Sequence, residues 1–261
     1  MTRAVGVELH VNEDRASKER VIYLGVPTFG VVSMRWHAHM LQLKNPLNRS
    51  VFHAYALGFE VGQARNYLVE QALHWQNEQG HTISHVFFVD DDTLIPPYAL
   101  DVLLSRNRPI VSGLYYAKTE SPQPLILMGP GQGTLHPVPR NTVVDCYAHG
   151  MGCTLIEMRV FRDLLAKGLV EYEDLPNGQR LPQFFKTTRD QVTPTEHQGN
   201  VVYNETEDVF FLKRAAQLGY QPSVDTSVFA FHWDQKGGVA YPLDLWTEYQ
   251  RTGNVTVGVA A

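Results

Sequence analysis

Residues 85–94, with the sequence His-Val-Phe-Phe-Val-Asp-Asp-Asp-Thr-Leu, join a strand pattern directly to a cluster of charges. The apolar run 86–89 predicts a buried β-strand, and Asp90, Asp91 and Asp92 follow it without a break. Adjacent carboxylates repel one another, and a divalent cation relieves that repulsion because hard cations bind carboxylate oxygens. Open α/β sheets bind ligands beyond the carboxyl ends of their strands. We therefore expect a metal and phosphate site at this strand end.

A helix cap is the alternative explanation of these carboxylates. Pro96 and Pro97 could begin a helix, and one aspartate in front of them would accept bonds from its first N–H groups. Capping requires one carboxylate, whereas three are present. The pattern therefore favours the metal site.

Strand and helix patterns alternate along the rest of the chain. The sequence predicts strands at 21–26, 51–56, 85–89, 109–113, 154–156 and 224–231, and helices at 31–44, 62–75, 97–104, 160–166, 208–218 and 243–251. This alternation favours an α/β fold with a Rossmann-like, mainly parallel sheet that is flanked by helices. Residues 119–142 are rich in Pro and Gly and predict loops or short edge strands.

The segment 171–205 is polar and turn-rich and has little periodicity. Long loops of this kind in compact domains are often functional lids. Tyr172, Phe184 and Phe185 would be poor choices for a permanently solvated loop, so we expect a lid or acceptor wall that closes over a bound ligand. A small, permanently folded subdomain is the alternative.

Composition sets limits on the class of protein. The 261 residues, 44% of them hydrophobic, suit one large α/β domain or two small ones. The net charge of −5, without a basic block, gives no general signal for binding nucleic acid. Cys146 and Cys153 lack the spacing of zinc ligands and are expected in the core. No apolar run approaches 18 residues and the N-terminus has no apolar signal region, so a soluble, cytoplasmic protein is expected.

Four features follow one another in a fixed order: Ala64-Arg65-Asn66, Asp90-Asp91-Asp92, Glu207-Asp208, and His232 after an apolar run. In this order the sequence resembles nucleotide-sugar glycosyltransferases of the GT-A fold, and among them glycosyltransferase family 2 most, over about residues 20–235. The turn at Pro27-Thr28 and the segment Gly150-Met151-Gly152 also match segments of that family.

The resemblance implies one GT-A-like domain over residues 1–261. Its nucleotide-sugar-binding half would cover about residues 20–118, and its acceptor and catalytic half, on the C-terminal side, about residues 143–240. A polar leader is expected at residues 1–19. The implied activity is transfer of a sugar from a nucleotide-diphosphate donor, with a UDP-sugar favoured, to an acceptor hydroxyl. The acceptor stays open between a glycan, a lipid-linked molecule, a protein side chain and a modified nucleobase, and a lipid-linked acceptor would bring the protein to a membrane surface.

The expected metal site follows from the chemistry of this reaction. Negative charge grows on the departing diphosphate, and a bound Mn²⁺ or Mg²⁺ stabilises it as a Lewis acid. Asp92 is the expected direct ligand, with Asp90 and His232 as further ligands, and Asp90 and Asp91 are also candidates to contact the donor. An imidazole ligand would favour Mn²⁺. Alternatively, His232 is a buried, hydrogen-bonded histidine at a strand end.

Arg65 is expected on a helix face with Leu68, Val69 and Ala72. An arginine on an apolar face requires a partner. A donor diphosphate or an aspartate of the cluster would serve, because a guanidinium forks onto such oxygens. A surface position or an internal salt bridge is the alternative.

The acidic pair Glu207-Asp208 supplies the expected catalytic base. The acceptor hydroxyl must lose a proton as it attacks, and a carboxylate within hydrogen-bond reach can accept it. Asp208 is the first candidate and Glu207 the second, and direct attack with Asp208 as base inverts the anomeric carbon. Alternatively, both carboxylates only favour the positive end of the following helix.

Further contacts are expected from residues around these motifs. Donor binding is expected from Pro27, Thr28, Gly150 and Gly152, of which the glycines would let the backbone approach the sugar. An ordinary turn is the alternative for the glycines. Contacts with the sugar or the acceptor are expected from side chains near two strand ends, with core packing as the alternative: Tyr115, Tyr116, Lys118, Trp233 and Asp234.

Two other functions compete with this interpretation. A haloacid-dehalogenase-type phosphatase also has an Asp-x-Asp strand end, but its motif has Thr or Val where this chain has Leu94. A non-catalytic module that binds sugar nucleotides or glycans would keep the Asp cluster and tolerate loss of Asp208. A nucleotidyltransferase is disfavoured because no Gly-rich loop with a basic residue follows the first strand.

Overall fold

The computed structural model describes residues 19–242 except 48, 79, 131, 177 and 196–198, and it leaves the side chains of 19–20 and 189–204 undescribed. Five helices are present in this part of the chain: α2 (Met34–Gln42), α3 (Val61–His74), α4 (Ala99–Ser105), α5 (Met158–Ala166) and α6 (Glu207–Gln217). The main sheet contains β1 (Glu19–Thr28), β2 (Ser50–Leu57), β3 (Thr82–Val89), β5 (Ile110–Leu114), β7 (Val143–Asp145), β9 (Cys153–Glu157) and β14 (Ser223–Phe229). No described helix is long and apolar enough to cross a membrane.

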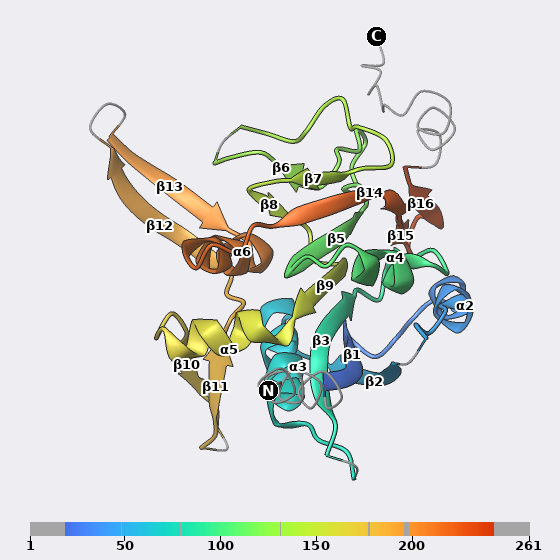
Figure 1. The fold of residues 1–261 in the computed structure, drawn as a ribbon. Helices are drawn as coiled ribbons and strands as arrows, with labels where there is room; N and C mark the ends of the chain where they lie inside the picture. The colour runs from blue at the N-terminus through green and yellow to red at the C-terminus, as the bar shows by residue number, and fades with distance from the viewer. Residues whose placement is uncertain are drawn as a thin grey trace, which may run out of the picture.

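The seven strands are arranged in the order β2-β1-β3-β9-β5-β14-β7 (Figure 1). Strands β2, β1 and β3 are mutually parallel, and β5 is parallel to β14. Strand β9 is antiparallel to both β3 and β5, and β7 is antiparallel to β14. Five of the seven strands therefore run in one direction, which confirms the predicted mixed α/β class with a mainly parallel sheet.

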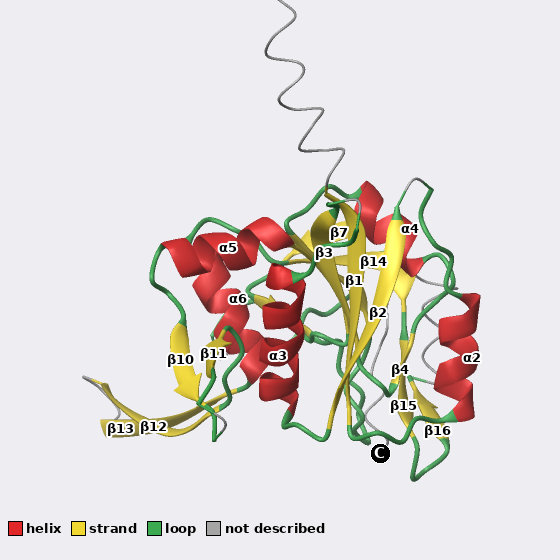
Figure 2. Cartoon of the chain, turned by 90° about the horizontal axis from the view of Figure 1, so that it is seen from below, coloured by secondary structure: helices red, strands yellow, loops and turns green. Residues whose placement is uncertain are grey.

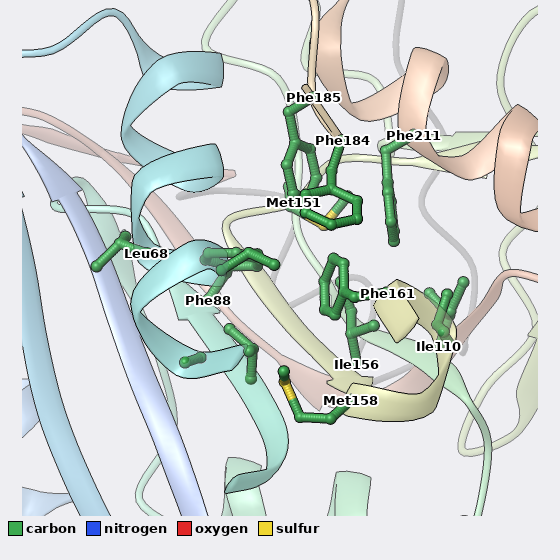
Figure 3. Packing of buried hydrophobic residues seen from close by; sticks show 14 of the residues in the cluster. Leu68, Phe88, Ile110, Met151, Ile156, Met158, Phe161, Phe184, Phe185 and Phe211 are labelled. Carbon is green, nitrogen blue, oxygen red and sulfur yellow. The ribbon is translucent and has the colours of Figure 1, made fainter. Parts of the chain in front are cut away.

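Helices cover both faces of this sheet (Figure 2). Helices α3, α5 and α6 enclose one core cluster, to which α3 contributes Ala64, Leu68, Val69 and Ala72, as the helical spacing predicts. Phe161, Phe184, Phe185 and Phe211 fill the same cluster (Figure 3). Helices α2 and α4 cover the other face, where Trp36, Leu100 and Leu103 are buried.

The strand directions bring several loops to one edge of the sheet. Strands β1, β2 and β3 end together at Thr28, Leu57 and Val89, because they are parallel. The parallel strands β5 and β14 end at the same edge, and the antiparallel β9 begins there. The edge is completed by a small sheet in which β15 (Phe231–Asp234) pairs with β4 (Thr93–Leu94) and β16 (Val239–Tyr241). The Pro27-Thr28 turn, the Asp cluster, the segment Gly150–Gly152 and His232 thus lie at this edge.

The remaining described strands form three small antiparallel sheets. One pairs β6 (Ile126–Leu127) with β8 (Ala148–His149), which agrees with the short strands expected in and near 119–142. The other two are the hairpins β10 (Glu171–Asp174) with β11 (Arg180–Gln183), and β12 (Thr188–Thr195) with β13 (Gly199–Glu205). The expectation of a loop at 171–205 is therefore wrong. The described part of this segment consists mainly of the strands of two hairpins.

The junction between the two hairpins is anchored in the core. Phe184 and Phe185 are buried. The Asn66 amide donates to the Phe185 carbonyl at 2.8 Å and accepts from the Phe185 N–H at 2.8 Å. This arrangement fits the permanently folded subdomain better than a lid. The leader through residue 18 and the helix expected at 243–251 lie outside the described residues.

Candidate active site

The backbone of the Asp cluster is fixed from three directions. The Asp90 N–H donates to the Gly152 carbonyl at 3.1 Å, and the Asp90 carbonyl accepts from the Thr93 N–H at 3.0 Å. The same carbonyl accepts a 2.8 Å bond from the Trp36 indole on α2. The strand-end aspartates are thus held in place by segments from α2, β4 and the start of β9. Trp36 had no predicted role, although a tryptophan on an otherwise exposed helix is a signal for one.

Arg65 links the Asp cluster to helix α6. It is almost fully buried, and one guanidinium nitrogen donates to Asp90 Oδ1 at 2.7 Å and to Oδ2 at 3.0 Å. The other terminal nitrogen donates to Glu207 Oε1 at 2.5 Å. Burial opposes the charge of Arg65, but the charges of Asp90 and Glu207 outweigh it and raise the pKa of the guanidinium. The predicted partner from the Asp cluster is present, and Glu207 is a second partner.

Glu207 and Asp208 occupy the first turn of α6 but differ in their surroundings. Burial raises the pKa of Glu207, the Arg65 charge opposes the rise, and Asp208 adds to it. Asp208 is half-buried, and its Oδ1 accepts from the Thr206 hydroxyl and from the Val209 N–H at 2.8 Å. Glu207 is therefore committed to an ion pair, whereas the bonds of Asp208 are local and go to one oxygen.

The negative charge of Asp208 acts on groups across the same site. Burial raises the pKa of Tyr115 well above its ordinary value, and the charges of Asp90 and Asp208 both add to the rise. Burial lowers the pKa of His149 to about 4, although the Gly150 carbonyl and Asp208 favour its protonation. Asp208 and Asp90 therefore both lie within electrostatic range of the buried Tyr115.

Asp92 contacts two basic side chains. Its Oδ2 accepts from the Lys118 ammonium and lies 3.4 Å from His232 Nε2. Burial alone would raise the pKa of Asp92, but His232 and Lys118 lower it to about 2. His232 Nδ1 donates to the Tyr116 carbonyl at 2.9 Å, because a carbonyl oxygen can only accept, and Nε2 faces Asp92. The predicted neighbours Asp92 and His232 are brought together.

The donor set at Asp92 and His232 fits a divalent cation. A carboxylate and an imidazole that donates its other N–H to a carbonyl are a common pair of metal ligands. Within the described residues, no group of three His, Cys, Asp or Glu side chains is arranged to hold a metal by itself. Asp92 and His232 could therefore supply two ligands to a divalent cation, and the remaining ligands would have to come from other groups.

A pocket of about 130 Å³ lies beside Asp91. It is lined by Pro27, Thr28, Phe29, Phe59, Val61 and the three aspartates. Burial raises the pKa of Asp91, a hydrogen bond with Thr28 opposes the rise, and Asp92 and Asp90 add to it. Phe29 and Phe59 were not predicted. Phe29 directly follows β1 and Phe59 lies two residues after β2, which is where the strand-end rule places ligand contacts.

The two glycines before β9 are packed so closely against neighbouring side chains that neither position has room for a Cβ atom. A Cβ atom at Gly150 would lie 2.3 Å from the Tyr115 hydroxyl oxygen. A Cβ at Gly152 would lie 2.6 Å from Thr93 Oγ1 and 3.0 Å from Asp90 Oδ2. The Tyr115 hydroxyl accepts the Gly152 N–H at 2.8 Å. The close approach of backbone expected here is thus made to Tyr115 and Asp90, and contact with a donor stays a prediction.

Two of the expected sugar or acceptor contacts, Tyr115 and Tyr116, pack in the core, which is the alternative given for them. Tyr115 is buried, with its hydroxyl against Gly152. Tyr116 is fully buried, with its ring packed against Phe229. Asp234 accepts the Lys236 N–H at 3.0 Å within the β15–β16 turn, and its contact with a sugar or acceptor stays a prediction. Neither tyrosine ring is accessible for stacking, because both fill the core behind the strand ends.

Other predicted residues are placed as follows. The Trp233 ring lies under the Arg35 guanidinium, whose carbon is 4.5 Å from the ring centroid, and the Trp233 backbone N–H donates to the Asp92 carbonyl at 2.6 Å. Cys146 and Cys153 are buried and unpaired, as expected for core residues. A larger pocket of about 670 Å³ lies among α4, the loop before β2, His85 on β3 and the end of β9, and no aspartate of the cluster lines it.

Comparison with known proteins finds similar solved structures but no match at the level of sequence. No family model matches it, and no curated protein matches it. Similar solved structures include A197 from STIV, with 14% identity, a TM-score of 0.48, and coverage of 83% of this chain and 87% of that chain. They also include S. aureus TarS 1-349 in complex with UDP-GlcNAc, with 12% identity, a TM-score of 0.41, and coverage of 80% and 57%.

A second structure of S. aureus TarS 1-349 has 14% identity, a TM-score of 0.38, and coverage of 80% of this chain and 59% of that chain. The chain thus spans less than two thirds of both TarS chains. No family membership follows from likenesses at this level.

Proposed function

We propose that this chain is a GT-A-type glycosyltransferase that moves a sugar from a nucleoside-diphosphate donor, with a UDP-sugar favoured, to an acceptor hydroxyl. The observation that carries the proposal is the bridge made by Arg65, which bonds to Asp90 and to Glu207. The bridge joins the strand-end aspartates to the carboxylate that directly precedes Asp208. Diphosphate chemistry and base chemistry thus have candidate groups at one edge of the sheet.

The charge balance of this edge supports a metal-dependent donor site. Five carboxylates gather here, namely Asp90, Asp91, Asp92, Glu207 and Asp208, and the paired cations are Arg65 and Lys118. A diphosphate adds further negative charge, so a divalent cation is required to bind it. Asp92 and His232 would hold Mn²⁺ or Mg²⁺. When bound, the metal would supply a Lewis acid for the charge that develops on the departing diphosphate.

The pocket beside Asp91 is suited to the nucleoside part of the donor. The rings of Phe29 and Phe59 offer apolar surface for a base. The Thr28 hydroxyl accepts the Gly30 N–H at 3.0 Å and also bonds with Asp91. These bonds orient Asp91 at the pocket wall, where its carboxylate can accept ribose hydroxyl bonds.

Asp208 is the carboxylate available as base. Glu207 is committed to Arg65, whereas the contacts of Asp208 involve only Oδ1 among the described residues. As the acceptor oxygen attacks the anomeric carbon, its proton passes to Asp208, and the bond from carbon to the diphosphate oxygen breaks with its electrons. Direct attack from the opposite side inverts the anomeric configuration.

The arrangement at Asp90 disfavours the phosphatase. In that reaction the first aspartate of the motif would attack phosphorus. Here the Arg65 guanidinium engages both Asp90 oxygens, at 2.7 and 3.0 Å. A nucleophile held in this way would have to lose its ion pair before it could attack.

Donor hydrolysis tests the proposed function without knowledge of the acceptor, because water can replace the acceptor hydroxyl. Wild-type protein is incubated with UDP-, GDP-, CDP- and dTDP-sugars and Mn²⁺, and the released nucleoside diphosphate is measured. We expect Asp208→Asn to lower the rate by about 10²-fold. Asp101→Asn, a change of the aspartate in the first turn of α4, is the matched control and should leave the rate within about twofold. Equal rates for wild type and Asp208→Asn would contradict the assignment of the base.

A further inference from the structure

Helix α2 carries apolar side chains on two opposite faces. Trp36, Met40 and Leu43 follow i, i+4, i+7 spacing and pack into the core between α2 and the sheet. Met34 and Leu41 are separated by the same seven residues but are exposed, at 79% and 74% of their surface. At 100° per residue the two stripes lie about half a turn apart. One stripe is thus explained by the core, and the outer one has no partner among the described residues.

Apolar exposure continues from α2 into the segment that precedes it. Phe29 is 81% exposed and Val31 is 72% exposed, and both lie between the end of β1 and the start of α2. Tyr55 and Leu57 at the end of the edge strand β2 are also exposed. A Cβ atom at Gly30 would lie 3.3 Å from Leu57 Cδ2, so the two strand ends touch.

Helix α2 lies at the edge of the molecule (Figure 2), with the end of β1 leading into it. We call the exposed apolar residues of this region the apolar face, which consists of Phe29, Val31, Met34, Leu41, Tyr55 and Leu57. A contiguous apolar patch on a protein surface generally marks an interaction site.

The chain segment that carries the apolar face contains no carboxylate side chain, whereas the three aspartates border the face only at Phe29, on its pocket side. No Asp or Glu occurs from residue 29 to residue 59, although the whole chain has a net charge of −5. Arg35, His37 and Lys44 are exposed in this stretch. On the helical projection, Arg35 and His37 lie on either side of the outer apolar stripe. Apolar residues flanked by basic residues are the pattern of helices that lie in a membrane interface.

We propose that the apolar face docks on an anionic phospholipid bilayer. The apolar side chains would enter the boundary between head groups and acyl chains, and the flanking basic groups would face the anionic head groups. A second copy of the chain is a poorer partner. A symmetric contact would bring the same basic groups of both copies together, and like charges at an interface oppose association.

Docking would place the candidate active site at the bilayer. Phe29 belongs to the apolar face and also lines the pocket beside the three aspartates. If the proposed function is right, a lipid-carried acceptor would then reach the pocket from the membrane side. The docking itself does not depend on that function, because it is measured without donor or metal.

Vesicle flotation of the full chain tests the proposal. Vesicles of phosphatidylcholine alone are compared with vesicles that also contain phosphatidylglycerol. We expect wild-type protein to float with the anionic vesicles, and Met34→Glu and Leu41→Glu to lower the bound-to-free ratio by about tenfold each. Lys44→Gln should lower it about fivefold. Met128→Glu, at a less exposed methionine outside the apolar face, is the control and should float like wild type.

Several outcomes would overturn the proposal. One is wild-type protein that stays with the unbound fraction on anionic vesicles, and another is unchanged flotation of both glutamate variants. A dimer that Leu41→Glu dissociates, detected by light scattering in the absence of vesicles, would assign the face to a second copy. Melting temperatures establish that each variant is folded, and Met34→Gln and Leu41→Gln replace any variant that is not.

Discussion

Arg65 and Glu207, 142 positions apart in the sequence, form a 2.5 Å ion pair beneath the edge of the sheet. The pair fixes the start of α6 against α3, and the second guanidinium nitrogen fixes Asp90 in the same way. A buried guanidinium with two carboxylate partners explains why an arginine can occupy an otherwise apolar helix face.

The first prediction concerns this ion pair. Arg65→Met leaves Asp90 and Glu207 without their partner in a partly buried site, and we expect the free energy of unfolding to fall by about 3–5 kcal/mol. Urea unfolding measures the change. Arg180→Met, which removes an exposed pair with Asp174, is the control and should cost less than about 1 kcal/mol. Equal, small effects for the two variants would mean that the Arg65 pair contributes little.

The second prediction concerns the space at Gly152. Gly152→Ala places a methyl group 2.6 Å from Thr93 Oγ1 and 3.0 Å from Asp90 Oδ2. We expect a loss of about 1–3 kcal/mol in unfolding free energy, because the chain must shift to relieve the overlap. The double variant Gly152→Ala/Thr93→Ala should recover part of the loss, since the nearest atom is removed. Additive effects in this cycle would contradict the predicted contact.

The third prediction concerns Lys118, whose ammonium occupies one side of Asp92. A metal at Asp92 must displace it, so Lys118→Met should bind Mn²⁺ about tenfold more tightly than wild type in the absence of nucleotide. Calorimetry measures this affinity, and Lys167→Met at the exposed end of α5 is the control. Weaker or unchanged Mn²⁺ binding by Lys118→Met would show that Asp92 does not hold the metal in competition with Lys118.

The fourth prediction concerns acid stability. Burial, with the charges of Arg49 and Arg159, lowers the pKa of His85 to about 4. Between pH 6.5 and 4 the unfolded chain binds a proton at this residue and the folded chain does not, so stability falls as the pH falls through this window. His85→Gln should remove about 1–3 kcal/mol of that decline.

Urea unfolding at pH 7 and pH 4.5 gives the decline for each variant. His74→Gln is the control because the His74 side chain is largely exposed. A decline in His85→Gln as steep as in wild type would contradict the assignment. His149, whose pKa burial also lowers to about 4, accounts for part of the decline that remains.

Local sequence patterns predicted most of the elements at this edge. The strand before Asp90, the helix that carries Arg65, and the helix that begins at the acidic pair lie where apolar periodicity placed them. Gly219 has a φ of 83° directly after Leu218, the C-cap residue of α6, as expected for a helix-ending glycine. The apolar run before Asp90 and the helical spacing around Arg65 carry this information within a few residues.

Long-range pairing could not be predicted in the same way. The antiparallel direction of β9 is set by its pairing with β3 and β5, and its own five residues do not predict that direction. The strands of hairpins β10–β11 and β12–β13 are mostly polar, so they lack the alternation of apolar and polar residues that predicts a strand. The contact of Lys118 with Asp92 joins two loops, and the burial of Tyr116 depends on Phe229 in a strand far along the chain.

The central claim is that Asp92 and His232 bind a divalent cation together with a nucleoside diphosphate. The most direct measurement is the melting temperature of wild type and Asp92→Ala with UDP, GDP, CDP and dTDP, with and without Mn²⁺. Because a ligand of the folded state raises the melting temperature by mass action, the account predicts a rise for wild type with at least one nucleotide, with UDP favoured, only when Mn²⁺ is present, and no rise for Asp92→Ala. The same nucleotide-dependent rise in Asp92→Ala, or no rise for wild type with any of the four, would contradict it.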